Sequence, residues 1–177
     1  MKRKNSFLLQ AAGMILLTAL IPGNLSAKDF SKEIAGVKAG KNTAAKAHWW
    51  GFNKEDSTKA LQAALNSGAK KVYIEKMASP WVTGPLVVPS DIEIYFADGV
   101  IVQAKKGVWQ EKRGRRFVQR RMFEIHQKKN VVLEGKGKVK LIFPRSEQKD
   151  HRHTISILDS DNVKIKNFDI CFISFFY

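Results

Sequence analysis

Residues 124–134 read Glu124-Ile125-His126-Gln127-Lys128-Lys129-Asn130-Val131-Val132-Leu133-Glu134, and this stretch decides the fold. It contains an apolar strand end, a polar turn that closes on Asn130, and a strand of the form apolar–any–apolar. The same order recurs at residues 85–95 and 156–166, with Asp91 and Asn162 at the position of Asn130. The intervals between these positions are 39 and 32 residues. Intervals of this size indicate a solenoid whose coils carry loop insertions.

The Asp or Asn at the repeated position has a physical use in a tight turn. Asn tolerates the left-handed backbone conformation, and its amide can hydrogen-bond to neighbouring backbone groups. Stacked coils can place such amides above one another as a ladder. The strands that follow are then expected to stack into inward and outward rows. The inward rows hold Val131 with Leu133 and Val163 with Ile165, and the outward row holds Glu93, Val132 and Lys164, of which Val132 is an unusual outward residue.

One helix is predicted, over residues 56–68. Asp56 or Ser57 can accept hydrogen bonds from its first free N–H groups, and Gly68 can end it in a left-handed conformation. Its apolar residues fall on one face at helical spacing; they are Ala60, Leu61, Ala64 and Leu65. Everything after Val72 is interpreted as short strands and turns, because no second helical pattern occurs.

The first 27 residues have the layout of a secretory signal peptide. Lys2, Arg3 and Lys4 precede an apolar run, and Leu25-Ser26-Ala27 supplies small residues for cleavage. The alternative is a transmembrane anchor, but the run is shorter than the roughly 20 residues that span a bilayer. We therefore predict a secreted or periplasmic protein without a membrane anchor after cleavage. Residues 28–48 are predicted to be a loosely ordered leader, and residues 49–177 the domain.

Positive charge is concentrated in one part of this chain. The formal net charge is +15, and residues 104–152 contain 16 Lys and Arg against five Asp and Glu. Such a run is either a solvated face or a surface for a polyanionic partner. Outside the cytoplasm that partner would be an anionic polysaccharide, and no nucleic-acid-reading motif is present, so nucleic acid is not expected.

The basic loop at residues 112–121, within an insertion over residues 105–121, is the strongest candidate for binding. Arg grips a carboxylate or sulfate with two parallel hydrogen bonds, and Trp109 and Phe117 could offer ring faces to sugars. A flexible, solvated loop is the alternative. The predicted glycan-binding residues are Trp109, Arg113, Arg115, Arg116, Arg120 and Arg121.

Three segments resemble the pectin lyase-like superfamily of polysaccharide lyases and polygalacturonase-type glycoside hydrolases. Residues 55–65 are similar to its opening helix, which plugs the end of the coil, and residues 96–102 to its first-coil step. Residues 130–137 and 162–168 are similar to its Asn-led steps. The resemblance implies an all-β, right-handed parallel β-helix with a capping helix, present here as about three coils. It also implies a hydrolase or lyase that acts on an anionic glycan.

The chain departs from that superfamily where chemistry would be expected. The hydrolase motifs N-x-D, D-D, G-H-G and R-x-K do not occur in order, so we assign no catalytic residues. Residues 170–177 are almost wholly apolar, unlike a solenoid cap. We expect a truncated N-terminal portion that is inactive alone. The alternative is a non-catalytic, β-helical glycan-binding or surface-structural module.

Other polar residues of the sequence are candidates for acid–base or metal chemistry. Asp159 and Asp161 fit turn positions that satisfy backbone N–H groups, and Asp169 could face either way. His151 and His153 lie two apart, but no third ligand with metal-site spacing accompanies them. We therefore expect neither a metal nor another cofactor. Cys171, the single cysteine, can form no intrachain disulfide.

Overall fold

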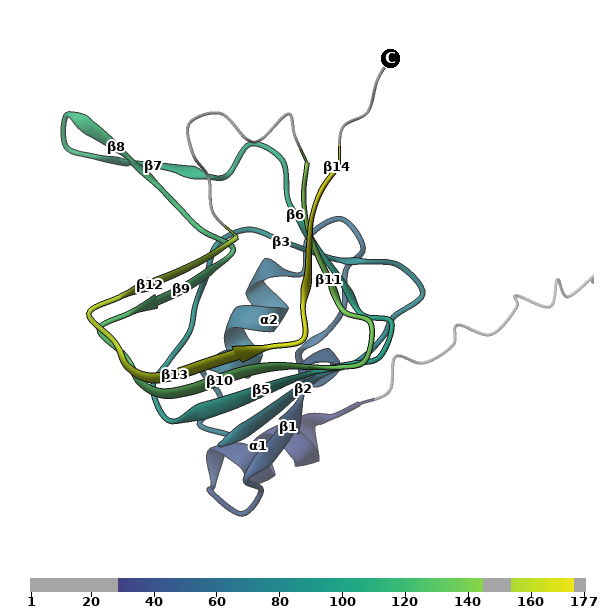
Figure 1. Ribbon diagram of the computed structural model, residues 1–177. Helices are drawn as coiled ribbons and strands as arrows, with labels where there is room; N and C mark the ends of the chain where they lie inside the picture. Colours follow the sequence, from purple (N-terminus) through teal and green to yellow (C-terminus); the bar gives the residue numbers. More distant parts are fainter. Residues whose placement is uncertain (1–28, 145–153, 174–177) are drawn as a thin grey trace, which may run out of the picture.

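The computed structural model describes residues 29–144 and 154–173, which wind through three parallel sheets (Figure 1). The first, sheet A, is ordered β1 (Ala44–Lys46), β2 (Lys71–Ile74), β5 (Ile92–Ala97), β10 (Lys129–Lys136) and β13 (Asp161–Lys166). Sheet B is ordered β14 (Asp169–Ile173), β11 (Lys140–Pro144), β6 (Ile101–Ala104) and β3 (Trp81–Thr83). Sheet C is ordered β12 (Ile155–Leu158), β9 (Phe123–His126) and β4 (Leu86–Val87).

The chain passes from sheet A to sheet B to sheet C and then returns to sheet A beside its earlier strand. This succession of parallel neighbours is the topology of a parallel β-helix. The predicted repeat is observed in the register, since Val131 lies opposite both Ile92 and Val163. The strand before this corner, β4 of sheet C, does not keep the 39-residue interval. Leu86 lies opposite Phe123, which is 37 residues later. The corner between β4 and β5 is therefore two residues shorter than the corner between β9 and β10.

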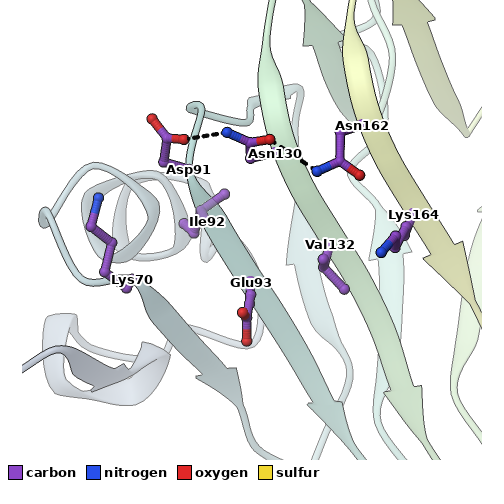
Figure 2. A pocket seen from close by; sticks show the side chains of 8 residues that line it. All are labelled: Lys70, Asp91, Ile92, Glu93, Asn130, Val132, Asn162 and Lys164. Atoms are coloured by element: carbon purple, nitrogen blue, oxygen red, sulfur yellow. Dashed lines mark hydrogen bonds between the residues drawn. The ribbon is translucent and has the colours of Figure 1, made fainter.

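The predicted amide ladder is present at the start of these sheet A strands. Asp91, Asn130 and Asn162 have positive φ angles of 58°, 55° and 51°. The Asn130 side-chain amide donates to Asp91 Oδ1 at 2.8 Å, and the Asn162 amide donates to Asn130 Oδ1 at 2.9 Å (Figure 2). Asn and Asp are the residues that adopt this conformation at least cost.

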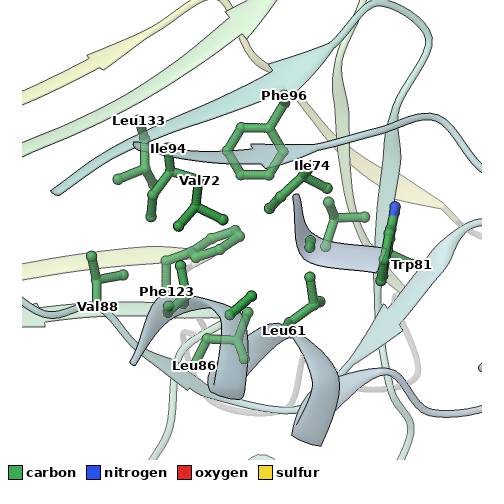
Figure 3. Close-up of a cluster of buried hydrophobic side chains, with 14 of the residues drawn as sticks. Leu61, Val72, Ile74, Trp81, Leu86, Val88, Ile94, Phe96, Phe123 and Leu133 are labelled. Atoms are coloured by element: carbon green, nitrogen blue, oxygen red, sulfur yellow. The ribbon is translucent and has the colours of Figure 1, made fainter. Parts of the chain in front are cut away.

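The core lies inside the coil, where alternate residues of each strand point inward. Val72, Ile94 and Leu133 lie in register on sheet A and are fully buried (Figure 3). Phe96 and Phe123 meet edge to face, with 5.9 Å between ring centroids. Val163 and Ile165 occupy the same rows on β13 but are only half-buried, since β13 is the last strand of sheet A.

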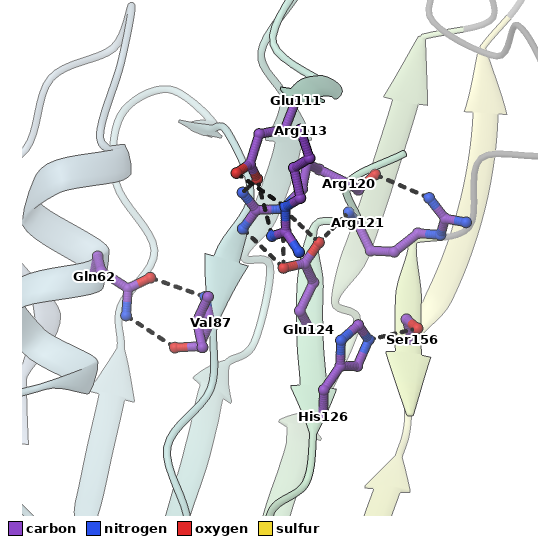
Figure 4. A network of polar contacts seen from close by, with 9 residues as sticks. All are labelled: Gln62, Val87, Glu111, Arg113, Arg120, Arg121, Glu124, His126 and Ser156. Atoms are coloured by element: carbon purple, nitrogen blue, oxygen red, sulfur yellow. Dashed lines mark hydrogen bonds and ion pairs between the residues drawn. The ribbon is translucent and has the colours of Figure 1, made fainter. Parts of the chain in front are cut away.

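Helix α2 (Thr58–Leu65) is shorter than predicted but begins as expected. Asp56 Oδ1 accepts a hydrogen bond from the Thr58 N–H at 3.0 Å, and Gly68 has a φ of +88°. Leu61, Ala64 and Leu65 are the buried residues of α2. Gln62 forms two hydrogen bonds with the backbone of Val87, accepting from its N–H and donating to its C=O, both at 2.9 Å (Figure 4). Because β4 is the outermost strand of sheet C, Gln62 takes the place of a missing neighbouring strand.

Residues 29–48, which the sequence predicted to belong to a loosely ordered leader, contain regular secondary structure. Helix α1 (Ser31–Lys38) is followed by β1, which pairs with β2, and by the 3₁₀ helix η1 (Ala47–Trp50). Val37, Ala45 and Ala47 are buried in the common core. The Ala- and Gly-rich composition hid this order, because small residues bury little area individually and depend on neighbours that are distant in sequence.

The predicted signal peptide, residues 1–27, lies outside the described residues. Within residues 29–144 and 154–173, no helix has the length and apolar character needed to cross a bilayer.

Replacing Gln62 by Ala would leave the N–H and C=O of Val87 without their protein partner. We expect a loss of about 1–2 kcal/mol in the free energy of unfolding, measured by urea denaturation. Gln62→Glu should lose less, because it keeps the acceptor. The exposed Lys59→Ala is the control on the same helix; an equal loss there would contradict this role for Gln62.

Two substitutions of Asn130 separate its conformation from its hydrogen bonds. Asn130→Gly and Asn130→Ala both remove the ladder hydrogen bonds. Glycine adopts a positive φ at little cost, whereas alanine is strained there by its Cβ. We expect the Ala variant to be about 1 kcal/mol less stable than the Gly variant in thermal or urea unfolding. Equal stability of the two variants would show that backbone strain at this corner is unimportant.

Candidate glycan-binding site

The predicted basic loop is an antiparallel hairpin that projects from the coil between β6 and β9 (Figure 1). It consists of β7 (Gln110–Arg113) and β8 (Arg116–Gln119), and we call residues 110–119 the basic hairpin. Residues directly opposite each other in such a pair share a face. Lys112 lies opposite Phe117, and Arg113 lies opposite Arg116. The hairpin therefore has one face with an aromatic ring beside a cation and another with two guanidinium groups.

The base of the basic hairpin is held by a buried ion pair (Figure 4). Arg120 Nε and Nη2 donate to the Glu124 carboxylate, each at 2.8 Å at closest, and the Arg121 N–H adds a bond at 2.9 Å. Arg120 also donates to Glu111 at 2.5 Å. Glu124 is only 7% exposed. Burial opposes ionisation of Glu124, but the hydrogen bonds from Arg120 and Arg121 outweigh it and lower its pKa.

Trp109 is not the exposed sugar-stacking ring that the sequence predicted. Its side chain is 1% exposed and packs on Phe143, with 4.6 Å between ring centroids. Its indole N–H donates to the backbone C=O of Lys105 at 2.5 Å. Trp109 thus anchors the base of the basic hairpin, and the assignment as a glycan-binding residue was wrong because the sequence did not reveal its contact with β11.

Some of the predicted arginines are engaged in contacts within the protein, and others are free to contact a ligand. Arg120 belongs to the first group, and Arg113 pairs with Glu111 at 3.2 Å. Arg121 Nη1 donates to the C=O of Arg120 at 3.3 Å. Arg115 and Arg116 are exposed at the tip, and their side chains make no ion pair with any described residue.

Phe117 replaces Trp109 as the exposed ring of this site. Its side chain is 66% exposed on the same hairpin face as Lys112. A large apolar ring at that exposure contributes nothing to the core, whereas an aromatic ring beside a cation suits the face of a sugar that carries an anionic group. Phe117, Lys112, Arg115 and Arg116 are therefore exposed groups of the basic hairpin that have no described ion-pair partner and that a ligand can reach.

A groove of about 560 Å³ lies on the outer face of β3 and β6, and its lining includes Lys105, whose C=O accepts the indole N–H of Trp109 at the hairpin base. Its lining includes Val82, Gln103 and Glu55, and also Lys54 and Lys106, which have no described ion-pair partner. The ammonium group of Lys105 contacts Asp56 Oδ2 at 2.7 Å. Burial disfavours the Asp56 carboxylate, but the hydrogen bonds from Lys105 and Thr58 prevail and lower its pKa to about 2. The sequence did not predict this groove, because its residues come from three separate segments.

The carboxylates nearest the basic hairpin are unsuited to donate a proton. Hydrogen bonds from Arg113 and then Arg120 lower the pKa of Glu111, and that of Glu124 is lowered as well. Asp159 has a φ of 47°, which fits its predicted place in a turn. His126 contacts Ser156 at 2.9 Å on sheet C.

The described part of the chain contains no group of three or more His, Cys, Asp or Glu that could hold a metal ion. His151 and His153 lie outside it, so the prediction for that pair stays a prediction.

The molecule is therefore a parallel β-helix with a cationic hairpin and groove on its outside. No protein-family model and no curated protein sequence match the chain. It is similar to an iota-carrageenase solved in complex with iota-carrageenan fragments, at 20% identity and a TM-score of 0.50, over 72% of this chain and 28% of that one.

Two further structures match at 20% identity over 72% of this chain. One is a 1,3-alpha-1,4-beta-D-galactose-4-sulfate-3,6-anhydro-D-galactose-2-sulfate 4-galactohydrolase, with a TM-score of 0.49 over 30% of its length. The other is a family GH82 iota-carrageenase from A. fortis, with a TM-score of 0.48 over 28% of its length. The chain thus spans less than a third of these proteins. The likeness shows the fold and does not specifically support the pectin lyase-like superfamily.

Replacing Glu124 by Gln should loosen the basic hairpin from the coil. We expect a loss of about 1–3 kcal/mol in stability and faster amide hydrogen exchange in residues 110–121. Because the pKa of Glu124 is lowered in the fold, its contribution is complete above its ordinary pKa of about 4.3 and declines as the pH falls through the lower value. The free energies of unfolding of the wild type and the variant should therefore converge at acid pH.

Glu55→Gln serves as the control for that experiment, because Glu55 is exposed and makes no described ion pair. If both variants exchanged hairpin amides at the wild-type rate, the ion pair would have no role in holding the hairpin.

Proposed function

We propose that this chain is part of a secreted, polysaccharide-degrading β-helix protein and binds an anionic glycan through the basic hairpin and the groove beside β3 and β6. The observation that carries the proposal is the group of Lys112, Arg115 and Arg116 beside the exposed Phe117. Four cationic residues lie within five positions around the hairpin turn, and only Arg113 has a described acidic partner. Such charges repel one another, and an anionic ligand would relieve the repulsion.

The ligand class is supported by chemistry and by the structural neighbour. Guanidinium groups bind sulfate or carboxylate bidentately, and an exposed aromatic ring favours a sugar over a simple anion. The neighbour with a TM-score of 0.50 is an iota-carrageenase with bound iota-carrageenan fragments. A sulfated galactan is accordingly the first glycan to test, and a uronic-acid polymer is the second.

A non-catalytic role for the described region has a specific observation in its favour. Glu111 and Glu124 are both engaged by Arg120, and their lowered pKa values keep them ionised. Acid–base cleavage of a glycosidic bond needs one protonated and one ionised carboxyl group facing the sugar. We expect the purified chain 28–177 to bind iota-carrageenan without releasing reducing ends, and measurable release would contradict this.

Binding can be tested by calorimetry with iota-carrageenan and with polygalacturonate. The triple substitution Lys112→Ala, Arg115→Ala and Arg116→Ala should weaken binding roughly tenfold, at about 0.5 kcal/mol for each exposed charge. Wild-type affinity should fall as salt rises. Stronger binding of one polymer would distinguish sulfate from carboxylate recognition.

The matched control removes three exposed lysines near α1, namely Lys32, Lys38 and Lys41. It lowers the net charge equally but leaves the basic hairpin intact. An equal loss of affinity in both triple variants would indicate unspecific attraction to the net charge. Unchanged affinity in the hairpin variant would remove the hairpin from the proposal.

A further inference from the structure

A second groove, of about 360 Å³, lies on the outer face of sheet A (Figure 2). The amides of Asn130 and Asn162 border it along the ladder, and Val132 forms part of its floor. Lys70 and Lys164 stand on opposite sides. We call it the ladder groove. In Figure 1 sheet A lies in the lower part of the molecule, whereas the basic hairpin projects at the upper left.

Val132 is an apolar residue on the otherwise charged outward row of sheet A. It occupies the outward row between Glu93 on β5 and Lys164 on β13, and both of these neighbours are charged. Its side chain is half-buried and points away from the core into the ladder groove. Pockets for small ligands combine apolar surface, which takes the body of the ligand, with a few polar groups that orient it, and Val132 supplies apolar surface in the lining of this groove.

The polar groups around Val132 have unused capacity. Each ladder amide can donate two hydrogen bonds, and the side-chain NH2 groups of Asn130 and Asn162 each donate only one within the described structure. Asp91 Oδ1 accepts the first ladder bond, and its other oxygen is unoccupied there. Lys70 and Lys164 are exposed and make no ion pair with described residues.

Charge in the ladder groove is balanced, unlike that in the basic hairpin. Lys70 and Lys164 line the groove together with Asp91 and Glu93, and the Glu93 carboxylate also pairs with Lys71 at 3.5 Å. Glu93 is ionised, because a hydrogen bond from the Tyr95 hydroxyl at 2.6 Å lowers its pKa. A polyanion would gain little from the net charge of this groove. A ligand that combines hydroxyl donors for the carboxylates with one anion for a lysine would match it.

We propose that the ladder groove is a second glycan site that holds one saccharide unit bearing a single anionic substituent. The ring lies on Val132, its hydroxyls donate to Asp91, and its anionic group binds Lys164, which leans toward Val132 (Figure 2). The choice of an anionic saccharide rests on the proposed function, but the groove itself does not involve the hairpin.

Two sites on different faces give the protein a property that one site cannot supply. A chain with two separated glycan sites can join two polysaccharide strands, or engage one long strand twice and gain avidity. The hairpin site should be strongly weakened by salt, because it relies on charge density. The ladder groove should be less salt-sensitive, because hydroxyl contacts and an apolar floor contribute to its binding.

The test uses calorimetry with an iota-carrageenan tetrasaccharide on the chain 28–177. Wild type should bind two tetrasaccharides, and the triple hairpin variant should retain one site. In that triple background, Val132→Glu should weaken the remaining binding at least about tenfold, because it places a carboxylate under the ligand, and Lys164→Ala should weaken it about threefold. Lys166→Ala, an exposed lysine two residues along the same strand, is the matched control and should change it less than about twofold. Circular dichroism verifies that each variant is folded.

The outcomes separate the two proposals. The proposal of a glycan site in the ladder groove would be overturned if the triple hairpin variant bound no tetrasaccharide. It would also be overturned if Lys166→Ala weakened binding as much as Lys164→Ala. The hairpin proposal would stand in both cases. If the hairpin substitutions had no effect while Val132→Glu removed all binding, the hairpin proposal would fall and the groove would stand. Failure of the wild type to bind would overturn both.

Discussion

The structure depends on the hydrogen-bonded ladder of Asp91, Asn130 and Asn162. Each of these residues turns the chain into sheet A in a left-handed conformation, and each amide is bonded to the coil before it. A slip of one residue would exchange the inward and outward faces of the following strand. By setting where each strand begins, the ladder places Ile94, Leu133 and Ile165 in one inward row. The core and the outer grooves both follow from that register.

The first coil has strand edges with no preceding coil to pair with, whereas the strands of later coils pair with the coil before them. Helix α2 lies beside β4, and Gln62 satisfies the backbone of Val87 as an adjacent strand would. On sheet A the same need is met by β1, which pairs with β2. Unpaired strand edges favour unwanted association, so both devices make one end of the coil compatible with solvent.

The basic hairpin shows how one residue type serves two purposes. Arg120 is held between Glu111 and Glu124 and ties the hairpin to the coil, whereas Arg115 and Arg116 remain exposed. Trp109, hydrogen-bonded to Lys105, connects the hairpin base with the groove beside β3 and β6. Arg120 and Trp109 hold the hairpin base, so the exposed arginines are presented in a defined position. This would lower the entropic cost of binding the polyanion proposed as the ligand.

The sequence by itself determined the repeat, the left-handed corners at Asp91, Asn130 and Asn162, and helix α2, because these depend on local conformational preference and on short-range periodicity. It also located the basic insertion. The tertiary structure alone decided that Trp109 is buried against Phe143, that Arg120 is neutralised, and that residues 31–50 are ordered parts of the domain. It alone assembled the two grooves from distant segments. These features depend on contacts between coils, and no pattern within a single segment encodes which side chains another coil will cover.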